Sequence, residues 1–226
     1  MNAENKAFIG VDVQETRGCC FAAMKGDGSL LESWWFSDPE KEVTQLVRRL
    51  KQVYHVFIGI DAPRMPLTAP RKWYWERDRW RLRQPSERGY GRHCEIVIRA
   101  HNLANPQFTP LVGEAKPWMR TGFRLFVALQ DIVPTYEVFP TASYALLRGI
   151  KDVQVLIDFS AFSTGPKDML DAFVAAVTVR EFVFGRGSEV GGGDGLGKIV
   201  LPRPLRTPLI KGVLSWPEEQ QKKTNV

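Results

Sequence analysis

Phe8-Ile9-Gly10-Val11-Asp12 and Phe57-Ile58-Gly59-Ile60-Asp61 are two nearly identical stretches of this chain of 226 residues. Each is a short apolar run that ends in a carboxylate, which is typical of a strand buried on both faces. Side chains alternate along a strand, so the glycine and the aspartate of each stretch share one face. Parallel neighbours lie ~4.8 Å apart, and the two aspartates would then stand side by side at one end of a sheet.

Two adjacent carboxylates repel each other, and each raises the pKa of the other unless a cation lies between them. The matched pair Asp12 and Asp61 therefore predicts a metal site. The alternative interpretation is that two core strands simply end at polar residues, which is the better account of either stretch taken alone.

The length and composition favour one domain with an insertion. We expect this domain over residues 1–205, its insertion over about 64–132 and an extended tail over 206–226. Hydrophobic residues make up 44% of the chain, yet no apolar stretch reaches 18 residues, so no membrane span is expected. The polar start predicts no secretory signal. Three cysteines, two of them adjacent, make a poor disulfide framework and indicate a cytoplasmic setting.

The order of patterns predicts an α/β fold, with a meander of three strands, a helix and a parallel fourth strand. A fifth strand and a long helix would follow the insertion, and a glycine-rich loop and an edge strand would come last. The expected strands are about 7–13, 19–25, 30–36, 55–61, 135–140 and, at the edge, 198–201; the expected helices are about 38–54, 71–83, 86–103, 118–130 and 166–184.

Two further acids stand in apolar surroundings, Glu137 in the fifth strand and Asp171 in the long helix. A lone buried carboxylate is costly unless it is paired or bound to a metal. Asp168 lies one turn before Asp171 on the same helical face. An arginine of the insertion is the alternative partner for Asp171, and solvation at the first helical turn is the alternative for Asp168. Carboxylates that converge in this way favour Mg²⁺ or Mn²⁺.

This order of elements and acids resembles the ribonuclease H-like plan, which implies a mixed five-stranded sheet flanked by helices, here with a basic helical insertion after the fourth strand. In that plan, carboxylates on the first strand, on the fourth strand and on the last helix hold the metal. Asp12, Asp61 and Asp171 match those positions. More narrowly, the chain resembles the family called domain of unknown function 429, which is described as predicted nucleases of this fold. The matching pieces are Gly10-Val11-Asp12, Ile60-Asp61-Ala62-Pro63, Arg92-His93-Cys94-Glu95 with Arg99, Tyr136-Glu137-Val138-Phe139-Pro140, Leu170-Asp171-Ala172, and Gly197-Lys198-Ile199 with Pro202. The family usually has aspartate where this chain has Glu95, so Glu95, like Asp168, is an additional candidate only.

The positive charge is concentrated in residues 64–99, which hold ten Lys or Arg and four Asp or Glu and so carry the whole formal excess of +6. Aromatic residues alternate with these arginines, a composition suited to nucleic acid. We expect a basic helical insertion whose substrate-binding side chains are Arg64, Arg92, Arg99, Trp73 and Trp75. Alternatively, each tryptophan packs on the core, and Arg92 and Arg99 neutralise the carboxylates rather than clamp a phosphate.

The sequence thus favours a hydrolase, a metal-dependent nuclease in which Asp12, Asp61 and Asp171 bind two ions and Glu137 is a further ligand or a base. A second hypothesis is a nucleic-acid-binding module that has kept the fold without turnover. A third is an ATP-binding domain of the actin-like or sugar-kinase type, against which stands the absence of small residues after Asp12.

Overall fold

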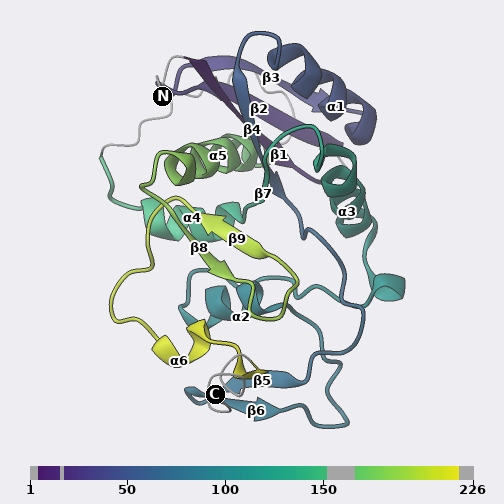
Figure 1. Ribbon diagram of the computed structural model, residues 1–226, viewed down its shortest axis with the longest axis vertical. Coiled ribbons are helices and arrows are strands. Elements are labelled where there is room, and N and C mark those ends of the chain that lie inside the picture. The colour runs from purple at the N-terminus through teal and green to yellow at the C-terminus, as the bar shows by residue number, and fades with distance from the viewer. Residues whose placement is uncertain (1–4, 16–17, 152–165, 219–226) are drawn as a thin grey trace.

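A mixed sheet of seven strands forms the centre of the protein, which we describe from a computed structural model over residues 5–15, 18–151 and 166–218 (Figure 1). In spatial order, the strands are β3 (Leu30–Phe36), β2 (Cys19–Lys25), β1 (Lys6–Asp12), β4 (His55–Asp61), β7 (Thr135–Glu137), β9 (Lys198–Leu201) and β8 (Ser188–Gly191). The predicted α/β class is confirmed. The predicted five-stranded sheet is wrong. The strand expected over 198–201 is present as β9, but it pairs with β7 on one side and, on the other, with β8, which was not predicted and forms the edge.

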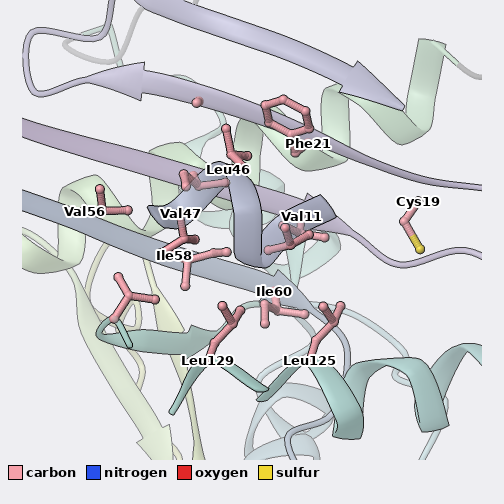
Figure 2. Close-up of a cluster of buried hydrophobic side chains, with 14 of the residues drawn as sticks. Val11, Cys19, Phe21, Leu46, Val47, Val56, Ile58, Ile60, Leu125 and Leu129 are labelled. Atoms are coloured by element: carbon pink, nitrogen blue, oxygen red, sulfur yellow. The ribbon is translucent and has the colours of Figure 1, made fainter. Parts of the chain in front are cut away.

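Strands β1 and β4 are parallel neighbours, as the two matched stretches predict. Helices α1 (Pro39–Leu50) and α3 (Pro117–Leu129) cover one face of the sheet. Figure 2 shows Ile58 and Ile60 of the sheet facing Leu125 and Leu129 of α3, with Val11 in the same cluster. Helix α1 begins where predicted, because the Asp38 side chain accepts a hydrogen bond from the Lys41 N–H and Pro39 occupies the first turn.

Helix α5 (Pro166–Val183) covers the opposite face and packs directly on β1 and β4 (Figure 1). The contact requires glycine in both strands. A Cβ atom at Gly10 would lie 1.9 Å from the Ala172 carbonyl oxygen, and one at Gly59 would lie 2.6 Å from a methyl group of Val179. Helix α4 (Pro140–Leu147), which the sequence patterns did not predict, packs on α5 and joins Ser143 to Thr178 by a hydroxyl hydrogen bond of 2.9 Å.

The insertion is not mainly helical, which corrects the expectation for residues 71–83. Strands β5 (Trp73–Glu76) and β6 (Arg79–Leu82) form an antiparallel hairpin there. Its turn residues Arg77 and Asp78 have φ values of 49° and 60°, which a continuous helix does not permit. The expected helix over 86–103 is reduced to α2 (His93–Ala100), and a short 3₁₀ helix, η2 (Val112–Glu114), precedes α3.

The segment after residue 205 does not form a wholly extended tail, which is a second correction. It contains helix α6 (Lys211–Leu214), and Trp216 is buried against Trp80 with ring centroids 5.1 Å apart. The Trp80 indole N–H donates to the carbonyl oxygens of Gly212 and Ser215. The end of the expected tail, residues 219–226, lies outside the described residues.

All three cysteines are buried free thiols. Among the helices of the described ranges, none has both the length and the apolar character that crossing a membrane requires.

Candidate functional site

Asp12 and Asp61 stand opposite each other in the parallel register of β1 and β4, directly after the pair Gly10 and Gly59. Because both glycines face α5, the alternation of side chains places both carboxylates on the α5 face, at the carboxyl end of the two strands. Asp12 is 2% exposed, whereas Asp61 is partly exposed. The structure therefore brings together the pair that the repeated sequence predicts.

Asp171 enters the same cleft from α5. The Tyr144 hydroxyl donates to its Oδ1 over 2.7 Å, and the Lys167 ammonium, one turn earlier, pairs with its Oδ2. The partner of Asp171 is thus a lysine of its own helix, which corrects the alternative of an arginine from the insertion. The Lys167 side chain is 73% exposed, so its ion pair with Asp171 is in contact with solvent.

The cleft has a volume of about 440 Å³ and is bounded by all three aspartates. Three polar residues from the segment between α2 and α3 also line the cleft: Asn105, Gln107 and Lys116. Lys116 donates to the Gln107 side chain over 3.0 Å and remains an exposed cation beside the acids. The three aspartates, the carboxylate of Glu15 and two ammonium groups therefore share one open cavity.

Burial raises the pKa of Asp12 from 3.8 to about 7, and repulsion by Asp171 and Asp168 adds to this effect. A hydrogen bond from the Gln14 amide, 2.5 Å from Asp12 Oδ2, opposes it. Burial, followed by repulsion from Asp12, holds the pKa of Asp61 well above its usual range. Such a pair of carboxylates gains from any cation that neutralises it.

The donor chemistry suits a hard divalent cation, since oxygen atoms of three carboxylates line the cleft. The side chains are nevertheless not arranged as a complete metal-binding group. Within residues 5–15, 18–151 and 166–218, no three Asp, Glu, His or Cys side chains form a metal-binding group. Both oxygens of Asp171 accept hydrogen bonds, so a cation shared by the three acids competes with Lys167 at Oδ2.

Asp168 is 5% exposed, so the interpretation of Asp168 as a solvated first-turn acid is wrong. Its charge raises the pKa of Asp12, which places it near the cleft, although it does not line the cavity.

Glu137 is not part of the carboxylate cluster, contrary to expectation. It pairs in register with Ile60 rather than with Asp61, so its side chain leaves the sheet on the face that α1 and α3 cover. The Arg92 guanidinium binds it there through two nitrogens, one of them 2.7 Å from Glu137 Oε2, and the Arg64 N–H donates to the same oxygen over 2.9 Å. The carboxylate is thus engaged in the core.

Arg92 is 1% exposed and cannot reach a substrate. It also binds Glu95, whose carboxylate accepts from the Arg92 and Thr109 backbone N–H groups. Glu95 therefore caps the first turn of α2 and ties it to Thr109, in the loop that follows the helix, so it stabilises the fold and does not line the cleft. Arg92 therefore neutralises Glu95 and Glu137, and neither Arg92 nor Arg99 lines the cleft of the aspartates.

The other predicted substrate-binding residues are dispersed. Arg64 donates to the Thr135 carbonyl and stacks on Phe126, and Trp73 and Trp75 pack against the cluster around α2 and β9. Arg99 alone stays exposed at a pocket of the basic segment.

The sequence analysis missed several residues of the site: Gln14, Asn105, Gln107, Lys116, Tyr144 and Lys167. Lys167 had a readable signal, since it precedes Asp171 by four residues on a helix. Tyr144 had none, because α4 itself was not predicted.

Comparisons of this protein with protein-family models, with curated proteins and with solved structures give no match.

Proposed function

We propose that the protein is a divalent-metal-dependent phosphodiesterase that acts on nucleic acid. The observation that carries the proposal is the side-by-side placement of Asp12 and Asp61 on the cleft that Asp171 also lines. The raised pKa values of Asp12 and Asp61 support it, because such carboxylates favour a bound cation. We also propose that the fold is ribonuclease H-like, as in the family called domain of unknown function 429. Strands β3-β2-β1-β4-β7 with α5 support this, and the β8–β9 hairpin is an addition to that plan.

Asp12, Asp61 and Asp171 would hold Mg²⁺ or Mn²⁺. When bound, these ions would polarise a phosphodiester and lower the pKa of a coordinated water. Lys116 and Lys167 would attract the phosphate backbone to the mouth of the cleft, where both are exposed. Gln14 would orient the Asp12 carboxylate through its amide. Glu137 has no part in this proposal, because Arg92 and Arg64 engage both of its oxygens.

The test is a titration of Mg²⁺ and Mn²⁺ with end-labelled single- and double-stranded DNA and RNA, for wild type, Asp12→Asn and Asp131→Asn. Asp131 is an exposed acid that does not line the cleft and serves as the matched control. We expect Asp12→Asn to cleave at least about a hundredfold more slowly than wild type. Even residues that only hydrogen-bond to a metal ligand contribute roughly 10–100-fold to metal affinity or activity. Equal cleavage by all three proteins, or none by wild type with any substrate, would refute the proposal.

A second candidate function is nucleic-acid binding without turnover. The occupation of both Asp171 oxygens by Tyr144 and Lys167 favours it, because these contacts compete with a metal ion for Asp171. It predicts salt-sensitive binding of nucleic acid by wild type, with no products at any metal concentration.

A further inference from the structure

A second pocket, of about 590 Å³, is lined by residues of the β5–β6 hairpin and of α2, two elements in the lower part of Figure 1. Its lining includes five arginines and two acids. The arginines are Arg71, Arg77, Arg81, Arg88 and Arg99. None of the three aspartates of the cleft lines this pocket, so its chemistry is separate from the proposed metal site.

Three of these arginines alternate with two aromatic rings in one continuous stack. Arg81 and Arg71 lie over Tyr74, with guanidinium carbons 5.0 and 4.1 Å from the ring centroid. Arg71 and Arg99 lie over Phe108, at 4.9 and 5.3 Å. Cation–π contacts hold a guanidinium plane in a fixed orientation while leaving its N–H groups at the edge available.

The charges of the stack are unequally compensated. Arg81 forms ion pairs of 2.6 Å with both Glu76 and Glu87. Arg71 and Arg99 form no ion pair with any carboxylate of the described residues. The Nε and Nη1 atoms of Arg71 are buried and have no hydrogen-bond partner there. Buried unsatisfied donors are costly, and a guanidinium without an anion more so.

Hydrogen bonds from the backbone hold the residues of the pocket in place. The Arg71 N–H donates to the Gly89 carbonyl over 2.9 Å, and the Gly89 N–H donates to the Tyr74 hydroxyl over 2.8 Å. Gly91, with φ of 98°, lies so close that a Cβ there would be 2.6 Å from Arg71 Nη1. Burial lowers the pKa of Arg71, with Tyr74 acting in the opposite direction. A preorganised cation of this kind needs little further ordering when it binds an anion.

We propose that this pocket binds the phosphate group of a nucleotide, free or within a nucleic-acid strand, through the Arg71 and Arg99 guanidiniums. Phosphate offers the paired oxygens that a guanidinium fork recognises. The volume is in the range of small-ligand sites and exceeds what inorganic phosphate fills, so a nucleoside extends from it. The inference needs neither a metal ion nor the aspartates, and it stands whether or not the cleft hydrolyses anything.

The test is calorimetric titration in a chelator with inorganic phosphate, a 5′-mononucleotide and a short single-stranded oligonucleotide. We expect Arg71→Gln to weaken mononucleotide binding at least about tenfold, as loss of a charge-assisted hydrogen bond does. Arg99→Gln, on an exposed position of α2, gives a second variant that does not disturb the hairpin. Arg79→Gln removes the same charge from β6 outside the pocket and is the matched control.

Mononucleotide binding weakened by Arg71→Gln and Arg99→Gln but not by Arg79→Gln supports the proposal, and so does wild-type affinity in Asp12→Asn. Preference for the oligonucleotide identifies a strand as the source of the phosphate, and equal affinity identifies a free nucleotide. Absence of binding of all three probes to wild type overturns the proposal. An equal loss in Arg79→Gln also overturns it, because binding then follows net charge rather than the stack.

Discussion

Replacing Asp12 by asparagine is expected to stabilise the fold while it removes the proposed metal site. The pKa of Asp12 is raised from 3.8 to about 7, because burial and the neighbouring acids disfavour its ionised form. This difference corresponds to about 4 kcal/mol at alkaline pH, which is an upper bound on the gain in the free energy of unfolding. Asparagine keeps an oxygen that can accept from Gln14, so the substitution loses little hydrogen bonding.

The expected gain depends on pH in a definite direction. Below about pH 4 the Asp12 carboxyl group is protonated in both the folded and unfolded states, and wild type and Asp12→Asn are equally stable. As the pH rises from about 4 to 7, the unfolded chain ionises first, and the folded wild type loses relative stability. Above about pH 7 the full difference is present.

The assay is thermal unfolding of wild type, Asp12→Asn and the control Asp131→Asn at about pH 5 and pH 8, with chelator or with Mg²⁺. For a chain of this size, about 4 kcal/mol raises Tm by roughly 8–16 °C at most. With chelator, we expect Asp12→Asn to unfold at a higher temperature than wild type at pH 8, with a smaller gap at pH 5. Mg²⁺ at a hundred times its Kd stabilises wild type by about 2.7 kcal/mol. A lower Tm for Asp12→Asn at pH 8 in chelator would refute the reasoning.

Three further predictions follow from the packing around the site. Gly10→Ala places a methyl group against the backbone of α5 and is expected to destabilise the fold by about 3 kcal/mol or more. Gly113→Ala, at a position with open space around it, is expected to be neutral, and denaturant unfolding measures both variants. Lys167→Gln removes a cation from the cleft and tightens Mg²⁺ binding in calorimetry; weaker binding would contradict the competition between Lys167 and the metal. Arg92→Met leaves the buried carboxylates of Glu95 and Glu137 unpaired and lowers the free energy of unfolding by about 3–5 kcal/mol. Adding Glu137→Gln in a double variant is expected to restore part of this loss, and purely additive effects of the two substitutions would disprove the coupling between Arg92 and Glu137.

The core of the site could be predicted because it rests on a repeated local pattern. An apolar run with a terminal aspartate defines both the strand and the face of its last side chain, and two such runs define their neighbour relation. Asp12 and Asp61 were placed correctly on that basis. Asp171 was singled out because a lone carboxylate in an apolar helix is costly, and the resemblance matched it to the third acid of the metal site.

Glu137 was misplaced because the sequence does not give the register of a three-residue strand. A shift of one residue between β7 and β4 moves its side chain to the other face of the sheet, and only tertiary packing decides it. The hairpin was misread for a different reason. Trp73 and Trp75 alternate with polar residues at the period of a strand, but the density of arginines suggested an amphipathic helix.

The anchoring of Trp80 by Gly212 and Ser215 has a consequence for biosynthesis. The hairpin is translated long before residues 211–216, so during elongation the indole N–H of Trp80 lacks its carbonyl acceptors and the ring lacks Trp216. The sheet strands, by contrast, are complete once β9 has emerged. On the ribosome, the β5–β6 hairpin therefore gains its contacts through Trp80 only after residues 211–216 have been made.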